Sequence, residues 1–179
     1  MTDRQDYERF LAGDITGFEE LVIRHKNGLI YFINRYIKDI SMAEDLAQDV
    51  FVEVYLHKER YNPQNEFKTY IYTIGHNKAV DYIRKNSRVS YVAEYDESSS
   101  EKDELFEKVA ESEEKKRLYM AIKQLKEEYQ SAVMLIDFEG MTYAEAAKVL
   151  GKTPAQMKIL IFRARKSLAK IFARQAQDE

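Results

Sequence analysis

Four short segments of the chain carry the signature of a helix start, and they constrain the fold more than any other feature. In each, a hydroxyl residue is followed three positions later by Glu or Gln, so that the two side chains can satisfy free backbone N–H groups of a first helical turn. The segments are Thr16 to Glu19, Ser41 to Glu44, Thr142 to Glu145 and Thr153 to Gln156. Apolar residues then recur at intervals of three and four. Since the 179 residues include only 6 Gly and 2 Pro, the pattern predicts an all-α fold.

The same pattern divides the chain into two small helical domains. Residues 1–86 hold several apolar stripes, interrupted by the turn signal Asn62-Pro63, and are expected to form one helical bundle. Residues 112–174 are expected to form a second helical unit. Between them, residues 87–111 include three consecutive serines and many acidic residues. This composition predicts a flexible acidic linker that is partly disordered.

Charge is unevenly distributed in a chain whose net charge is −3. Residues 58–88 carry a net charge of +4, residues 89–114 a net charge of −8, and residues 148–174 a net charge of +8 with no acidic residue. Two basic blocks therefore flank an acidic one, which indicates separate surfaces for separate partners. Solvated helix faces are the alternative interpretation, with less weight for the acid-free block.

Composition and motifs exclude several classes of protein. Without cysteine the chain has no disulfide framework, cysteine nucleophile, Fe–S cluster or cysteine-based zinc site. Its three histidines are scattered, and no catalytic or nucleotide-binding motif is present. Neither a long apolar run nor a signal-peptide core is visible. We therefore expect a cytoplasmic protein that is not an enzyme, binds no metal or other cofactor, and does not insert into a membrane.

Residues 142–168 have the layout of a helix-turn-helix. Small residues in the first helix allow a close crossing, Gly151-Lys152 forms the turn, and the second helix begins after Thr153. The N-terminus of the second helix is expected to face the major groove of DNA, with basic residues meeting phosphates. An ordinary helical hairpin is the less favoured alternative.

A second constellation is a stripe of acidic residues. Asp45, Asp49 and Glu53 are spaced by four, with His57 one turn further, so all four share a helix face. A helical-bundle metalloprotein could use such residues, but it would take them from several inward-facing helices. We favour a docking surface for a basic partner, and a solvated face remains open.

A third stretch, FKTYIYTIGHNKAVDYIRKNSR at residues 67–88, interleaves aromatic and basic residues. Tyr70, Tyr72 and Tyr82 alternate with cations, and Asn77 and Asp81 share a face. Aromatic rings beside cations suit unstacked bases. The alternative, that the rings lie in the core and the cations coat the outside, is favoured for Tyr70.

The order of these pieces resembles a known family. FEELVIRHKNGLIYFINRYI, AEDLAQDVFVEVY and YNPQNEFKTYIYTIGHNKAVDYIRK resemble region 2 of bacterial sigma factors, and LKEEYQSAVMLIDFEGMTYAEAAKVLGKTPAQMKILIFRARKSL resembles region 4. With a short acidic segment between the two regions, the chain resembles an extracytoplasmic-function sigma factor of the sigma-70 family. The resemblance covers about residues 18–86 and 115–170.

The resemblance implies partners and residue roles. It implies binding to core RNA polymerase, at the β′ clamp helices and the β flap, to promoter DNA, and to an anti-sigma factor. The residues implied to dock on the polymerase are Glu44, Asp45, Gln48, Asp49 and Glu53. Those implied at the −10 element, including a loop from Tyr61 to Phe67 that captures a flipped base, are Tyr61, Asn62, Lys68, Asn77, Asp81, Arg84 and Lys85. Those implied at the −35 element are Thr153, Gln156, Lys158, Ile159, Phe162, Arg163, Arg165 and Lys166.

The recognition helix departs from the family at two positions. Ile159 and Leu160 stand where polar residues are often found, and Phe162 stands where histidine is common. Helical spacing places Ile159 and Phe162 on the outside. They are expected either to contact thymine methyl groups or to pack against a protein that masks the helix.

Two rival interpretations and one regulatory hypothesis complete the predictions. A promoter-specific regulator that never joins the polymerase would explain residues 142–168 but not the acidic stripe, and the metalloprotein would explain only the stripe. We also hypothesise that the acidic linker screens the basic blocks and weakens DNA binding by the free protein. Its charges are Glu94, Asp96, Glu97, Glu101, Asp103 and Glu104.

Overall fold

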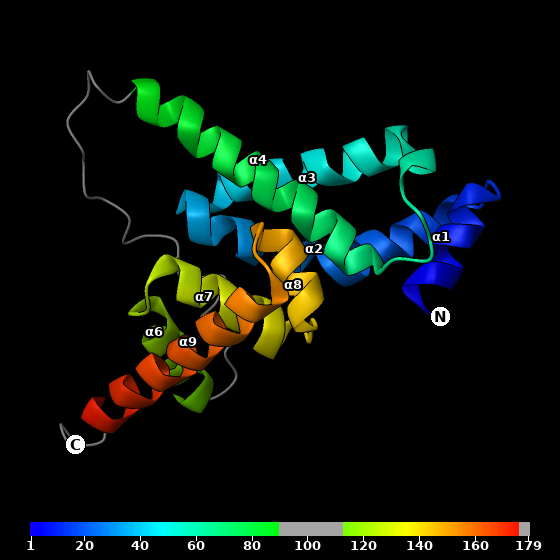
Figure 1. The fold of residues 1–179 in the computed structure, drawn as a ribbon. Coiled ribbons are helices and arrows are strands. Elements are labelled where there is room, and N and C mark those ends of the chain that lie inside the picture. Colours follow the sequence, from blue (N-terminus) through cyan, green and yellow to red (C-terminus); the bar gives the residue numbers. More distant parts are fainter. Residues whose placement is uncertain (90–112, 176–179) are drawn as a thin grey trace. The chain divides into compact units, whose positions relative to one another are not determined.

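The computed structural model describes residues 1–89 and 113–175, and every element in these two ranges is helical. It divides into two compact units (Figure 1). Helices α1 to α4 form the N-terminal unit, while α6, α7, α9 and most of α8 belong to the C-terminal unit. The predicted all-α architecture with two helical domains is confirmed. The predicted linker, and with it the hypothesis of a screening acidic segment, lies outside the described residues.

The N-terminal unit is built around one long central helix. Helix α2 (Ile15–Ile37) packs against α1 (Asp3–Leu11), α3 (Ile40–Leu56) and α4 (Phe67–Val89). A short 3-10 helix, η1 (Lys58–Arg60), leads from α3 into the loop before α4. The side chains that fill this core are fully buried: Tyr7, Leu21, Leu29, Phe32, Ile33, Val50, Phe67, Ile71 and Tyr72.

Helix α1 was not predicted from the sequence, although it begins with a complete capping box. The Thr2 hydroxyl accepts the Gln5 N–H at 3.3 Å, and the Gln5 side chain accepts the Thr2 N–H at 2.9 Å. Buried Tyr7 and Phe10 face the unit's interior. Because α1 has nine residues and buries only two large apolar side chains, it is too short to show a clear apolar period in the sequence.

Two predicted helix starts are wrong by two residues. The N-caps are Asp14 and Asp39, not Thr16 and Ser41. Asp14 Oδ1 accepts the Thr16 N–H at 3.1 Å, and Asp39 Oδ1 accepts the Ser41 N–H at 3.0 Å. A carboxylate two residues upstream competes for the same free amides and caps a helix as well as a hydroxyl does. The hydroxyl residues Thr16 and Ser41 were therefore wrongly predicted as the caps.

A charged cluster joins α1 to α2. The Arg24 guanidinium forms ion pairs with both Asp3 and Asp6. Its Nη2 lies 2.8 Å from Asp6 Oδ2, and the Asp6 side chain is only 1% exposed. His25 Nε2 lies 2.8 Å from Asp3 Oδ2. Burial pushes the pKa of Asp3 upward, but its hydrogen bonds and charge contacts with His25 and Arg24 outweigh burial and lower the pKa overall. The cluster therefore stabilises the fold above the ordinary pKa of an aspartate and loses this contribution in acid.

The C-terminal unit comprises α6 (Glu113–Lys123), α7 (Glu127–Val133), the π-helical turn η3 (Met134–Phe138), α8 (Tyr143–Leu150) and α9 (Pro154–Gln175). Both capping boxes predicted here are confirmed. The Thr142 hydroxyl accepts the Glu145 N–H, and the Thr153 hydroxyl accepts the Gln156 N–H. Gly151 ends α8 with φ +63°, a left-handed conformation that glycine adopts without strain. The helix-turn-helix is therefore present as predicted.

Gly17 marks the closest approach of α1 and α2. A Cβ atom at this position would lie 2.2 Å from the Asp6 carbonyl oxygen, and 3.1 Å from the Phe10 amide nitrogen. Because backbone atoms cannot move aside as a side chain can, we expect Gly17→Ala to lower the free energy of unfolding by about 1–3 kcal/mol. Urea titration followed by circular dichroism measures this loss.

Gly75→Ala is the matched control. Its Cβ would meet the Leu29 Cδ1 atom at 2.9 Å, the far end of a flexible side chain, so a smaller loss is expected. Equal stability of Gly17→Ala and the wild type would contradict the packing described for α1.

Candidate functional site

The acidic stripe lies on α3, on the side away from the core. Ala43, Ala47, Val50 and Val54 are buried against the rest of the unit, whereas Asp45, Gln48 and Asp49 are exposed. Asp45 and Asp49 are one helical turn apart, so the two carboxylates stand together on the surface.

The residues at the two ends of the predicted docking set, Glu44 and Glu53, are less accessible to a partner than Asp45 and Asp49. Glu44 and Glu53 are half-buried. Glu53 Oε2 lies 2.9 Å from the Lys78 Nζ of α4, so its charge is already compensated. The strongest negative potential on this face therefore comes from Asp45 and Asp49.

The described residues do not form the metal site considered above. No group of three or more His, Asp or Glu side chains among them is placed to hold a metal ion. Glu53 is turned toward Lys78, and His57 ends α3 as its C-cap with a backbone hydrogen bond to the Glu53 carbonyl. The metalloprotein interpretation therefore has no geometric support in this part of the chain.

An apolar groove of about 330 Å³ adjoins the acidic face, and sequence reasoning missed it. Val52, Tyr55 and Leu56 are about half exposed or more, with Leu56 at 65%. The sequence does contain a signal for this groove, because Val52, Tyr55 and Leu56 are apolar although they lie outside the stripe of α3 residues that faces the core. The groove is lined by Phe18, Val22, Gln48, Phe51, Val52, Tyr55 and Leu56.

Helix α4 presents a polar face. Asn77, Asp81, Arg84 and Lys85 are exposed, and Arg84 forms an ion pair with Asp81 at 2.9 Å. Lys68 is half-buried. The predicted grouping of Asn77 and Asp81 on one exposed face is confirmed.

The rings in this stretch do not form a row of stacking platforms. Tyr72 is fully buried and packs on Phe32, while Tyr70 and Tyr82 are half-buried. Burial lowers the pKa of His76, which favours its neutral imidazole. The core alternative is therefore correct for Tyr72, whereas Tyr70, for which it was favoured, is only half-buried.

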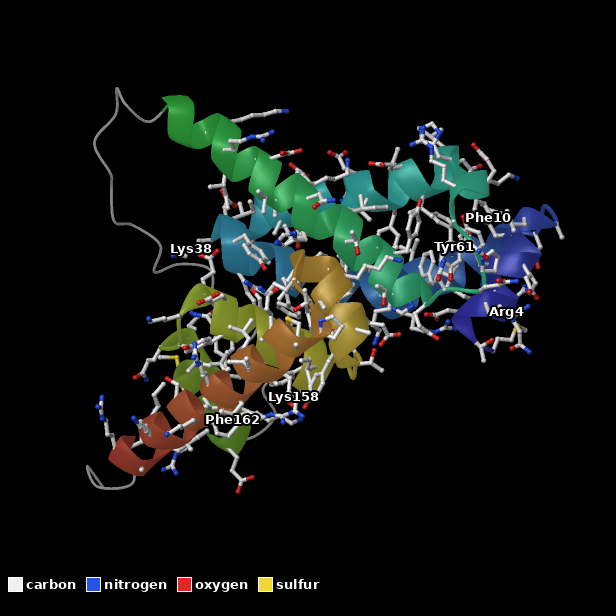
Figure 2. All side chains as sticks on the ribbon, viewed as in Figure 1. Arg4, Phe10, Lys38, Tyr61, Lys158 and Phe162 are labelled. Carbon is white, nitrogen blue, oxygen red and sulfur yellow. The ribbon has the colours of Figure 1, made fainter. Side chains whose placement is uncertain are left out.

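Tyr61 is a correction to the predicted −10 contacts. Its ring is 5% exposed and packs on Tyr7, Phe67 and Tyr70. Its hydroxyl donates to the Asn65 carbonyl, and burial raises its pKa to about 12. Tyr61 lies at the end of the unit where Phe10 also lies (Figure 2), and its contacts with the surrounding rings hold the loop in place from beneath.

Asn62 stays at the surface of the same loop. Its side-chain oxygen accepts the Gln64 N–H at 2.9 Å, and its carbonyl accepts the Asn65 N–H at 3.0 Å. These bonds close the predicted turn at Asn62-Pro63 and present the loop to solvent between two rigid elements.

The second helix of the helix-turn-helix, α9, carries the predicted DNA-contacting residues on its outer sides. Met157, Leu160, Ile161 and Ala164 are buried, and the eight predicted residues are all exposed. Figure 2 shows Lys158 and Phe162 projecting from this helix. The predicted outward placement of Ile159 and Phe162 is confirmed. Leu168, further along the inward side of the helix, is half-buried.

Two of these residues already have partners within the unit. The Gln156 Oε1 accepts the Thr153 N–H at 2.8 Å as part of the capping box. The Arg165 guanidinium binds Asp137 of η3 through two nitrogens. This bond raises the pKa of Arg165 and compensates its charge. Within the described residues no ion pair involves Lys158, Arg163 or Lys166, and these three supply most of the uncompensated charge on this helix.

Two family models match the chain. The model described as sigma-70 region 2 matches residues 21–89, and the model described as sigma-70, region 4 matches residues 115–168. The two matches together span more than half of the chain, the first within the N-terminal unit and the second almost wholly within the C-terminal unit.

Curated relatives match along nearly their whole length. The RNA polymerase sigma-H factor of Pseudomonas aeruginosa is 29% identical, over 94% of this chain and 92% of the relative. The ECF RNA polymerase sigma factor SigM of Bacillus subtilis is 26% identical, over 90% and 98%. The ECF RNA polymerase sigma-E factor of Escherichia coli is 25% identical, over 94% and 93%.

Solved structures share the fold. CnrH in complex with the cytosolic domain of CnrY has a TM-score of 0.66 and 23% identity, covering 96% of this chain and 97% of CnrH. The sigma factor RpoE in complex with the anti-sigma factor NepR, from Bartonella quintana, has a TM-score of 0.64 and 22% identity, covering 87% and 96%. No helix in the described ranges is long and apolar enough to span a bilayer.

Proposed function

The chain belongs to the sigma-70 family, in its extracytoplasmic-function class, and is a sigma factor that directs RNA polymerase to promoters; we propose that its two units divide this work between a polymerase-docking and −10 unit and a −35 unit. The region 2 match lies within the N-terminal unit, and the region 4 match lies almost wholly within the C-terminal unit. In this role the polymerase performs the chemistry, and the chain itself makes and breaks no covalent bond.

The observation that carries the docking proposal is the exposed pair Asp45 and Asp49 beside an apolar groove. Two adjacent carboxylates that form no ion pair within the described residues attract a basic surface over a distance set by ionic strength. The groove next to them, with Val52 and Leu56 exposed, offers apolar area that such a partner can bury. We assign this combined surface to the β′ clamp helices, with Glu44, Gln48 and Glu53 at its margin.

The −10 element is assigned to the exposed face of α4 and to the loop at Asn62. Arg84, Lys85 and Lys68 supply positive charge near Asn77 and Asp81, whose side chains hydrogen-bond to bases. A base that leaves the duplex loses a few kcal/mol of stacking, which contacts with the protein must replace. In this proposal binding energy drives opening, and Tyr61 contributes by holding the loop.

The −35 element is assigned to α9. Thr153 and Gln156 lie at its N-terminus, and Lys158, Arg163 and Lys166 flank the surface formed by Ile159 and Phe162. Arg165 has a smaller part in DNA binding than its neighbours because Asp137 compensates its charge. The β flap is the proposed protein contact of the same unit.

An anti-sigma factor is the further partner we propose. The structural neighbour RpoE was solved in complex with the anti-sigma factor NepR, and the neighbour CnrH in complex with the cytosolic domain of CnrY. In this chain the acidic face of α3 and its apolar groove are the surfaces whose occupation would block access to the polymerase.

Reversing both carboxylates on α3 tests the docking surface. We expect Asp45→Lys/Asp49→Lys to abolish co-elution with bacterial core RNA polymerase on a sizing column, because two attractive charges become repulsive at an unchanged site. Both residues are exposed, so circular dichroism should report an unchanged fold.

The matched control is Glu19→Lys/Glu20→Lys, which makes the same charge change at two exposed residues of α2. We expect this variant to co-elute. If both double variants lose the polymerase equally, or neither does, α3 is not the docking surface.

Variants of α9 separate preference from affinity. We expect Gln156→Ala to relax sequence preference in the −35 element by about 1–3 kcal/mol, through loss of its side-chain amide. Lys158→Ala is expected to weaken binding of all sequences alike and to reduce the salt dependence by about one phosphate contact. Fluorescence anisotropy of holoenzyme on duplex promoters at several salt concentrations measures both effects.

Gln156→Glu controls for the cap. A glutamate can still accept the Thr153 N–H and complete the capping box, but it has no amide to donate. Loss of preference in both Gln156 variants supports base contact. Loss in Gln156→Ala alone assigns the residue to the cap, and retained preference in both contradicts its proposed role.

A further inference from the structure

The outermost ridge of α9 is apolar at its centre. The buried residues Met157, Leu160, Ile161 and Ala164 define the inward side of the helix. At 3.6 residues per turn, the opposite side carries Ala155, Ile159, Phe162 and Lys166. Ile159 is 53% exposed and Phe162 is 67% exposed. A helix that enters a major groove with this side foremost brings two hydrocarbon side chains, not hydrogen-bonding groups, to the base edges.

We infer that Ile159 and Phe162 are specificity-determining residues that select thymine 5-methyl groups in the major groove of the −35 element. The inference rests on the proposed function of the C-terminal unit and adds the chemical class that it selects. It concerns this chain's own ridge, which replaces polar groups by hydrocarbon.

The major groove contains only one apolar group, the thymine methyl. Apart from small C–H groups such as cytosine C5–H, the other base-edge positions are hydrogen-bond donors or acceptors. An isoleucine or phenylalanine pressed on those positions would remove their water without replacing its hydrogen bonds, which is unfavourable. The ridge therefore favours thymine both by burying the methyl group and by rejecting the alternatives.

The polar residue nearest to the ridge is partly occupied. The Gln156 Oε1 accepts the Thr153 N–H at 2.8 Å, so a bidentate contact with adenine would have to share that oxygen between two donors. With this acceptor engaged, the apolar ridge accounts for a larger share of discrimination at the centre of the helix.

The charges around the ridge indicate DNA as its occupant. Lys158 and Arg163 lie on opposite sides of Ile159 by helical spacing, and Lys166 continues the ridge. Helix α9 contains no acidic residue. Phosphates line both edges of a major groove about 12 Å wide, so they can meet cations on both sides of an apolar centre. A protein partner would have to supply carboxylates in the same arrangement.

Arg165 is consistent with this orientation. It lies on the same side of α9 as Lys158, and its guanidinium is held by Asp137. The ion pair keeps a long cationic side chain directed toward η3 and away from the ridge, which leaves the hydrocarbon surface of Phe162 uncovered.

Uracil substitution tests the inference directly, because deoxyuridine differs from thymidine at this edge only by the missing methyl group. Holoenzyme is made from the full chain and bacterial core RNA polymerase, and it selects its preferred duplexes from a pool with a randomised −35 window. The pool is prepared in two versions, one with thymine and one with uracil in the window. We expect thymine at two or more positions of the selected window. Replacing each by uracil should weaken binding about fourfold, the effect of one buried methyl.

The variants link the methyl groups to the ridge. Each of the variants Ile159→Ala and Phe162→Ala is expected to lose the difference between thymine and uracil at one position of the selected window, the position that its missing side chain contacts. Ile23→Ala, which truncates an isoleucine of α2 that is 64% exposed, should keep the wild-type difference. The same number of uracils placed outside the window should have no effect.

Five results would overturn the inference. Selected sequences without thymine, or wild-type affinity unchanged by uracil, would remove it while leaving the −35 function in place. Equal sensitivity of wild type and Ile159→Ala to uracil would assign the methyl contact to another residue, and a loss of core polymerase binding by that variant would assign the ridge to a protein. Failure of the holoenzyme to select any window sequence would overturn the proposed −35 function and the inference together.

Discussion

The packing of α2 against α1, α3 and α4 determines which residues of the N-terminal unit face solvent. Leu21, Leu29, Phe32 and Ile33 are fully buried along one side of this helix. With the core side of α3 fixed by this packing, Asp45 and Asp49 necessarily point outward. The same constraint turns Asn77 and Asp81 of α4 to the surface. The functional faces are consequences of burial, since each helix has one apolar side to hide.

Much of this arrangement could be predicted because the helices are amphipathic and well capped. The helix-turn-helix is the clearest case: Thr142, Gly151 and Thr153 perform the local roles that their residue types predict. Where local chemistry offered two answers, the prediction was wrong. Asp14 and Asp39 replaced hydroxyl caps, and α1 was too short to show its period.

Residue roles that depend on distant contacts could not be predicted. Tyr61 lies in a loop and carries a hydroxyl, so the sequence suggests a surface residue. Contacts with Tyr7 from a helix more than fifty positions earlier bury it instead. Arg165 is similar, because Asp137 lies 28 residues away and no local pattern links them. Burial of Tyr61 and ion pairing of Arg165 depend on contacts across the fold that no local pattern predicts.

The central claim is that one chain joins two helical units, each of which brings the polymerase to one promoter element. Mapping transcription start sites on genomic DNA of the chain's own organism, with core RNA polymerase alone and with core plus the full chain, tests it most directly. The account predicts new start sites that share two short upstream elements at a constant separation. No new start sites, or start sites that share only one element, would contradict it.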